Sequence, residues 1–328
     1  MKNEKRVQMH TELYNRNVRI FEKEHRGTCT KCNKKIADGE TIHLGYDKQY
    51  ELAYVCDNCS KNLATIIVRH LYKKELYIKP NNKAKLWRFM DLAKYISLIQ
   101  SKSLFFARAD TFEDPFECAK GYKNLEYKWN ACYAGFCWGA ITSLENLPDI
   151  KKTYSEKEAL TEANRLLKQL KDLSRKERQN TFICCWHENE FESEAMWKLY
   201  SNNSSQGVAI QTTYERLYMA LDKDPDIDIG KINYIDFENH LCGVNGSFWY
   251  KRKSFEHEKE VRAVVKLFPE KELVQSVMKP INLDVLIENI YVSPTSPKWF
   301  RDLVIDINIK YGVEKEVFHS TLDKEPFY

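Results

Sequence analysis

The sequence predicts an α+β fold that follows a small cysteine-containing module. Three observations lead to this prediction. Two Cys-x2-Cys pairs lie near the N-terminus, a strand–helix–strand pattern opens the long remainder, and short apolar segments typical of strands follow, with a few helical patterns between them. The chain has 328 residues, of which 43% are apolar and 13% aromatic, which is enough for one large domain and an appendage.

Four segments divide the chain. Residues 1–26 are highly charged and predict a helix or a loose arm. Residues 27–79 contain the paired cysteines and form the predicted module, and residues 80–85 are a linker, because Pro80 and two asparagines interrupt any helix there. Residues 86–328 are the predicted α+β main domain.

The paired cysteines have the spacing of zinc ligands. They are Cys29, Cys32, Cys56 and Cys59, with 23 residues between the pairs. Two such pairs close a tetrahedron of thiolates, which leaves no open position for water, so we predict a structural zinc ion. Residues 60–76 follow with apolar residues at a 3.6-residue spacing and predict a helix. A cysteine pair that runs into a helix resembles a treble-clef or zinc-ribbon arrangement.

The main domain begins with a strand at 86–89 and a second strand at 104–107. Asp91 is the predicted N-cap of the helix between them, which presents apolar residues on one face. A turn at 110–117 is built around Asp114 and its following proline, and residues 156–178 predict a charged helix. Further strands are predicted at 182–186, 207–212, 230–237, 260–268 and 287–294, and further helices at 193–201 and 296–312.

The charge of the chain is unevenly distributed. Residues 1–88 carry 19 Lys and Arg against 10 Asp and Glu, a net charge of +9, and the remainder carries −5. A basic first quarter predicts a docking surface for an anion, with nucleic acid as the leading candidate, although a solvated basic surface explains the charge equally well. No segment resembles a membrane helix or a signal peptide, which predicts a cytoplasmic protein whose cysteines are metal ligands or buried thiols.

The segment "SFEHEKEVRAVVKLF" places Glu256, Glu258 and Glu260 at alternate positions before an apolar strand. In a strand such residues share a face, so we expect three crowded carboxylates, at least one of them with a raised pKa, as at a working site. The alternative is an ion-pair network with Arg262 on a solvated face.

Four motifs together carry a resemblance. They are "LWRF" at 86–89, "FEDPFE" at 112–117, "MWKLYSNNSSQGVAI" at 196–210 and "WYKRKSFEHEKEVR" at 249–262. The combination resembles a widespread bacterial domain-of-unknown-function family, over about residues 86–295. More distantly, the opening strand with its arginine and the late Glu-x-Glu resemble the ADP-ribosyltransferase superfamily, which implies a mixed-sheet core of that type.

The superfamily resemblance implies roles for individual residues. Arg88 would hold the diphosphate and ribose of NAD, which is the implied substrate. Glu260, the second glutamate of Glu-x-Glu, would hydrogen-bond the nicotinamide ribose and stabilise the oxocarbenium-like cation, while Glu258 faces the acceptor. Trp197 and Tyr200 are candidates for stacking on nicotinamide or a base, but core packing is the simpler explanation for both.

The same resemblance implies transfer of ADP-ribose to a nucleic acid or protein, a role as a toxin or antiviral effector, and an inhibitory partner protein. Two alternatives remain open. One is a non-enzymatic zinc-containing module that binds nucleic acid or protein, and the other is a nuclease in which Asp114, Glu117 and the glutamates hold Mg²⁺. Arg88 can also simply pair with Asp91, and a lone His187 is more often structural.

Overall fold

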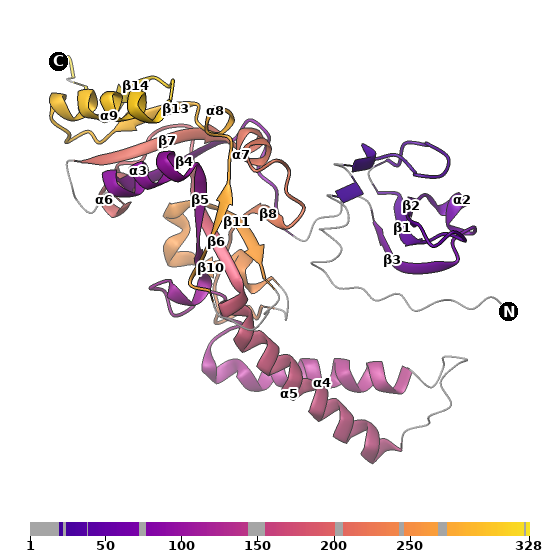
Figure 1. Ribbon diagram of the computed structural model, residues 1–328. Coiled ribbons are helices and arrows are strands. Elements are labelled where there is room, and N and C mark those ends of the chain that lie inside the picture. Colours follow the sequence, from indigo (N-terminus) through magenta and orange to yellow (C-terminus); the bar gives the residue numbers. More distant parts are fainter. Residues whose placement is uncertain are drawn as a thin grey trace.

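The computed structural model describes residues 20–21, 24–37, 39–71, 77–143, 155–200, 206–242, 246–267, 274–324 and 326–328 (Figure 1). The predicted arm at residues 1–26 therefore lies almost wholly outside the described residues. No helix in these ranges is long and apolar enough to cross a membrane.

The cysteine module is a small antiparallel sheet with the strand order β2-β1-β3. Its elements are β1 (Thr41–Tyr46), β2 (Leu52–Val55), the short helix α2 (Asp57–Ser60) and β3 (Thr65–Leu71). The helix predicted at 60–76 is wrong, because residues 65–71 form β3 and pair with β1; residues 72–76 lie outside the described ranges. The β-branched run "TIIV" at the start of β3 favours a strand over a helix.

The main domain is built on a mixed sheet in which nine of the described strands take part. Seven follow the order β12-β5-β6-β4-β7-β13-β14, and β11 pairs with β6 on one side and β8 on the other. Their bounds are β4 (Lys85–Asp91), β5 (Ser103–Arg108), β6 (Thr181–Glu188), β7 (Gly207–Thr213), β8 (Ile227–Lys231), β11 (Glu260–Lys266), β12 (Ser276–Pro280), β13 (Asn289–Val292) and β14 (Val317–His319). The predicted α+β class is confirmed.

One face of this sheet is covered by helices that supply the main hydrophobic core. They are α3 (Leu92–Ser101), α7 (Tyr214–Ala220), α8 (Leu283–Leu286) and α9 (Lys298–Tyr311). The predicted N-cap of α3 is confirmed, since the backbone N–H of Lys94 donates to Asp91 Oδ1 at 2.8 Å. The short helix α6 (Glu194–Tyr200) packs on the other face of β4, against Trp87 and Phe89.

A long helical hairpin extends away from the sheet (Figure 1). Its helices are α4 (Glu126–Ser143) and α5 (Glu156–Asn180), which pack through small and aliphatic side chains such as Ala159 and Ala163. Sequence periodicity predicts only α5, because α4 has apolar residues on all its faces. The short strands β9 (Asn233–Ile235) and β10 (Tyr250–Arg252) form a separate parallel pair.

The sheet forks along one edge of β6. Residues 86–87 of β4 pair with 187–188 at one end of β6, whereas residues 107–108 of β5 pair with 182–183 at the other end. Between these pairings residues 184–186 have no strand beside them on this edge, while β11 continues along the opposite edge. Strands β4 and β5 therefore diverge from β6, and the fork between them is open to side chains or a ligand.

Candidate active site and metal centre

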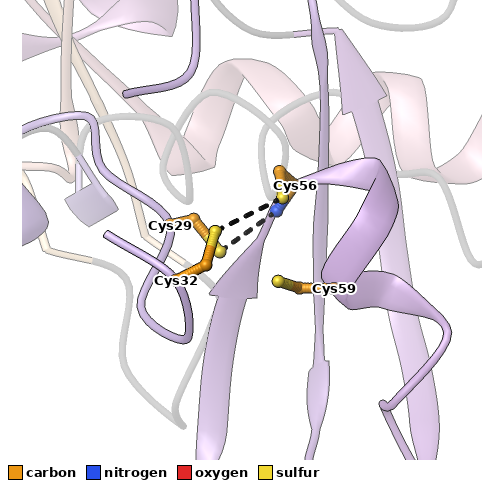
Figure 2. Close-up of side chains that lie close together, drawn as sticks. All are labelled: Cys29, Cys32, Cys56 and Cys59. Carbon is orange, nitrogen blue, oxygen red and sulfur yellow. Dashed lines mark hydrogen bonds between the residues drawn. The ribbon is translucent and has the colours of Figure 1, made fainter. Parts of the chain in front are cut away.

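The four predicted zinc ligands lie together in the N-terminal module (Figure 2). Their sulfur atoms all lie within 4.8 Å of one another, and the sulfurs of Cys32 and Cys56 are 3.8 Å apart. A tetrahedron with Zn–S bonds of about 2.3 Å requires sulfur separations of about 3.8 Å, so this geometry fits zinc. The first pair lies at the bridge between Thr28 and Lys35, and the second brackets the start of α2.

A cavity of about 410 Å³ fills the fork of the main sheet. Its walls come from β4, α3, β5, β6, α6 and the start of β11, so it collects residues that are far apart in the sequence. Four of the predicted site residues line it: Arg88, Tyr200, Glu258 and Glu260. Its volume is within the range of small-molecule binding sites.

Arg88 spans the fork. It follows directly after the last β4 residue that pairs with β6, and its guanidinium donates to Cys184 Sγ at 2.9 Å and to the carbonyl oxygen of Phe105 at 3.4 Å. It also lies over the ring of Trp186 at 5.7 Å from the centroid. The expected alternative pairing with Asp91 is not formed, and no carboxylate of the described residues forms an ion pair with this guanidinium. Its charge is therefore available to an anionic ligand.

The glutamates are arranged differently from the expectation of three on one strand. Residues 253–258 form a 3₁₀ helix, and the strand begins only at Glu260. Lys259 adopts a left-handed backbone with φ of 39°, which ends the 3₁₀ helix and turns the chain into β11. Glu256 is exposed and belongs to no cluster, whereas Glu258 and Glu260 are buried and both contact Lys251.

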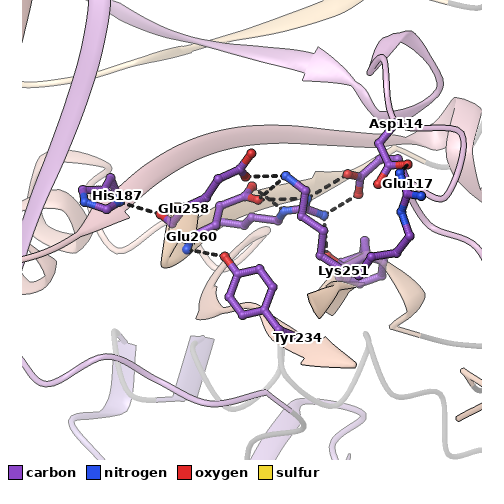
Figure 3. A network of polar contacts seen from close by, with 10 residues as sticks. Asp114, Glu117, His187, Tyr234, Lys251, Glu258 and Glu260 are labelled. Carbon is purple, nitrogen blue, oxygen red and sulfur yellow. Dashed lines mark hydrogen bonds and ion pairs between the residues drawn. The ribbon is translucent and has the colours of Figure 1, made fainter. Parts of the chain in front are cut away.

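The two buried glutamates, which line the cavity, belong to an ion-pair network (Figure 3). Lys251 Nζ lies 2.5 Å from Glu258 and 3.2 Å from Glu260. Arg262, which is fully buried, binds Glu260 through Nε at 2.6 Å and holds both carboxylate oxygens of Glu117. The suggested network of Arg262 with Glu256 and Glu258 on a solvated face is therefore wrong: Arg262 is buried, and its carboxylate partners are Glu117 and Glu260.

The pKa values of the two glutamates shift in opposite directions. Burial alone would raise the pKa of Glu260, but the charges of Arg262 and Lys251 outweigh it and lower the pKa to about 2. Burial raises the pKa of Glu258 above its ordinary value, since Lys251 offsets only part of the desolvation. Both oxygens of Glu260 are engaged by the two cations. Only one oxygen of Glu258 has a hydrogen-bond partner within the described ranges.

The turn motif "FEDPFE" joins this network from a distant part of the sequence. Asp114 accepts the backbone N–H of Phe116 at 3.0 Å, as expected for a turn, and also binds Arg252 at 2.7 Å. Arg252 lies over the ring of Phe116, and Glu117 pairs with the buried arginine of β11. The turn is therefore bound to the late motif by two ion pairs, one with Arg252 and one with Arg262. Neither Asp114 nor Glu117 lines the cavity.

This pairing is unfavourable for the nuclease alternative. Four of the carboxylates proposed to hold Mg²⁺ are bound by lysine or arginine, those of Asp114, Glu117, Glu258 and Glu260. The fifth, Glu256, is exposed. Among the residues that the structure describes, the four cysteines are the only group of three or more potential ligands close enough to share a metal ion.

The two aromatic residues of α6 have different positions. Tyr200 lines the cavity and is 43% exposed, and burial of its hydroxyl raises the pKa of the phenol. Trp197 is buried, packs edge-on against Phe89 at 4.9 Å and donates through Nε1 to Glu192 at 3.1 Å. Trp197 does not line the cavity, so its contacts favour the core-packing alternative over contact with a cofactor.

Three further residues contact the cavity or its glutamates, and sequence patterns did not single them out as functional. His187 lines the cavity with Nδ1 at 2.5 Å from the carbonyl oxygen of Glu258, and burial lowers its pKa. A carbonyl only accepts, so Nδ1 carries the hydrogen and Nε2 is an acceptor in the neutral ring. Tyr234 accepts the backbone N–H of Glu260 at 2.7 Å, and Lys251 joins the two glutamates. The sequence signal was the proximity of Lys251 to the Glu-x-Glu motif.

No protein-family model and no curated protein matches the chain, so the resemblance to the bacterial family of unknown function stays a prediction. Among solved structures, the chain is similar to DarT of Thermus sp. 2.9 in complex with ADP-ribosylated single-stranded DNA. The two are 8% identical, the match covers 75% of this chain and 97% of that chain, and the TM-score is 0.32. A likeness at this TM-score does not establish a common fold.

Proposed function

We propose that the main domain is an ADP-ribosyltransferase-like enzyme that transfers ADP-ribose from NAD to a macromolecular acceptor. The observation that carries this proposal is the cavity in the fork of the sheet, which is lined by Arg88 from β4 and by Glu258 and Glu260 from the late motif. Such a site offers a cation for the diphosphate and carboxylates for the positive charge that develops on the ribose as nicotinamide leaves.

The geometry supports a division of labour between the glutamates. Glu258 has a carboxylate oxygen without a protein partner among the described residues, so we assign to it the contact with the nicotinamide ribose. Glu260 has both oxygens bound by Lys251 and Arg262, and we assign to it the positioning of Lys251 and thereby of Glu258. This order is the reverse of the one that the Glu-x-Glu resemblance implies.

The remaining residues take supporting roles. Arg88 lies against Trp186 and Cys184 and has no carboxylate partner among the described residues, as suits a residue that holds a diphosphate. Tyr200, on the rim of the cavity, is placed to stack on a ring of the ligand. The neutral Nε2 of His187 can accept a proton from an attacking acceptor group.

The acceptor class is proposed from the charge of the chain. The net charge of +9 over residues 1–88 favours a nucleic acid, which the zinc-containing module would dock. A protein acceptor and a function as a toxin or antiviral effector, held in check by an inhibitory partner, are implied by the superfamily resemblance alone. The main competitor is a binding module without enzymatic activity, in which the same cavity only recognises a ligand.

The decisive experiment measures nicotinamide release from NAD in the presence of a cell extract and labelled NAD. We expect the wild-type chain to consume NAD and to label a macromolecule. Glu258→Gln, which keeps the shape of the side chain, should lower the rate by about 10²- to 10³-fold, the usual cost of losing one electrostatic partner of the transition state. The matched control is Glu256→Gln, since Glu256 is exposed two residues away and has no part in the network.

Three results separate the alternatives. Equal NAD consumption by the wild type and Glu258→Gln would overturn the assignment of Glu258. A wild-type chain that consumes no NAD with any extract, but binds nucleic acid or protein, would favour the binding module. Cleavage of nucleic acid that requires Mg²⁺ would favour the nuclease.

A further inference from the structure

A second cavity, of about 290 Å³, lies at the base of the helical hairpin, between α4, α5 and the loop before α4. It shares no lining residue with the cavity in the fork. We propose that it binds the phosphate group of a nucleotide or of a nucleic-acid strand. This inference does not depend on the transferase activity of the main domain.

The first argument is the charge of the lining. Five cationic side chains line the cavity against one carboxylate, that of Glu126. The five are Lys120, Lys123, Lys171, Arg175 and Arg178. A cavity with this excess of cations is unfavourable without an anion, and arginine is the side chain best suited to a phosphate.

The second argument is that neighbouring carboxylates neutralise only part of this charge. Lys123 and Lys171 share the single carboxylate of Glu126, at 2.5 and 2.6 Å. Lys120 binds Glu177 at 2.8 Å, and Arg175 reaches Asp172 only at 3.5 Å on the exposed surface. Arg178 forms no ion pair with any residue that the structure describes.

The third argument is the presence of unused hydrogen-bonding atoms in the lining. Ser174 Oγ, Arg178 Nε and Asn130 Oδ1 are buried atoms without a hydrogen-bond partner in the described part of the chain. Unpaired buried polar atoms are costly, and three of them in the lining of one cavity would be satisfied by a polar ligand. The serine and the arginine are donors that suit phosphate oxygens, and the asparagine oxygen is an acceptor that suits a hydroxyl or amino group of the same ligand.

The helices place these groups by simple periodicity. Residues 171, 174, 175 and 178 have the spacing i, i+3, i+4, i+7 on α5 and so share one face, which points at Glu126, Trp129 and Asn130 of α4. Trp129 is buried and forms an apolar wall, with its Nε1 donating to the carbonyl oxygen of Cys242 at 3.0 Å. A volume near the lower limit of ligand pockets fits a mononucleotide or one unit of a strand.

The test titrates the purified full chain with uridine monophosphate, uridine and inorganic phosphate by calorimetry, at about 50 mM salt, where phosphate contacts are strong. We expect uridine monophosphate to bind at least tenfold more tightly than uridine. Arg178→Gln should weaken this binding about tenfold, or about 1.4 kcal/mol. Lys176→Gln, which removes the same charge from an exposed residue of α5 outside the cavity, should leave it unchanged.

Two further variants keep the result interpretable. Ser174→Ala should weaken binding severalfold without removing a charge, and Lys128→Gln, at an exposed residue of α4 outside both cavities, should have no effect. An oligouridylate strand tests the source of the phosphate. If the strand binds more tightly than uridine monophosphate, with the same dependence on Arg178, the natural ligand is a nucleic-acid strand. If the strand binds equally or more weakly, the ligand is a free nucleotide. The proposal is overturned if uridine binds as well as its monophosphate, if the Arg178 and Lys176 variants behave alike, or if nothing binds.

Discussion

At the scale of single residues, the most consequential one is Glu260. It is buried, and its carboxylate is the shared counter-ion of Lys251 and Arg262. Arg262 in turn is satisfied by Glu117 and the carbonyl oxygen of Phe248, so the network is closed on the side away from the cavity. Removing one partner of such a network leaves an uncompensated buried charge.

We therefore predict that Glu260→Gln lowers the free energy of unfolding by about 3 to 5 kcal/mol at neutral pH. The reason is that Lys251 and Arg262 both pair with Glu260 and would lose this counter-charge. Denaturant unfolding measures the effect, and Glu256→Gln is the control, expected within about 0.5 kcal/mol of the wild type. If the Glu260→Gln variant were as stable as the wild type, the charge of Glu260 would not contribute to the free energy of unfolding and the prediction would be wrong.

The same residue makes stability depend on pH. The pKa of Glu260 is about 2 in the folded chain, against an ordinary value of 4.5, so the unfolded chain binds the proton first as the pH falls. The contribution of Glu260 is thus fully present above about pH 4.5 and is lost as the pH falls towards 2. We predict that the stability difference between wild type and Glu260→Gln shrinks across this window. A difference that stays constant from pH 6 to about pH 2 would contradict the assignment.

At the scale of elements, the structure shows which patterns in the sequence were sufficient. Strand β4, helix α3 and strand β5 were predictable because an N-cap, an amphipathic face and two apolar runs agree with one another. Residues 65–71 were not, because their apolar spacing also suits a helix, and pairing with β1 decides for the strand. The 3₁₀ helix before Glu260 was missed because alternation of glutamates looks like a strand.

The N-cap of α3 gives a prediction at this scale. Asp91 accepts the backbone N–H of Lys94, and its side chain also lies 3.2 Å from the ammonium group of Lys94. Asp91→Ala should destabilise the chain by about 1 kcal/mol through loss of the cap. Asp91→Asn keeps a side-chain oxygen for the cap and should cost much less. Equal unfolding midpoints for the alanine and asparagine variants would mean that the cap hydrogen bond is not what Asp91 contributes.

At the scale of the whole molecule, the candidate site is the place where four sequence motifs meet. The early strand supplies Arg88, the turn supplies Glu117, the α6 motif supplies Tyr200, and the late motif supplies Glu258 and Glu260. The sequence identified these residues, because charged and aromatic residues in multi-residue motifs are visible without a structure. It could not pair them, since their contacts join segments up to 145 positions apart and depend on the fork of the sheet.

The two parts of the chain are held by separate hydrophobic clusters. The module is held by a small cluster that includes Phe21, Ile36, Ile42 and Tyr54, and the main domain by the large cluster beneath its sheet. A core as small as that of the module rarely folds without help. The four cysteines are in position to supply that help, because a structural zinc ion contributes its binding free energy to folding.

We therefore predict one zinc ion per chain and a fold of the module that depends on it. Metal analysis should find the ion, and a strong chelator should make residues 27–71 sensitive to protease while the main domain keeps its thermal transition, because the core of that domain contains none of the four ligands. Cys29→Ser with Cys56→Ser should reproduce the effect of the chelator. Cys132→Ser, at an exposed cysteine of α4, is the control and should retain the metal. Full zinc retention in the double variant would refute the prediction. So would a module that resists protease equally with and without the chelator, because the protein alone would then hold the four thiolates within 4.8 Å of one another.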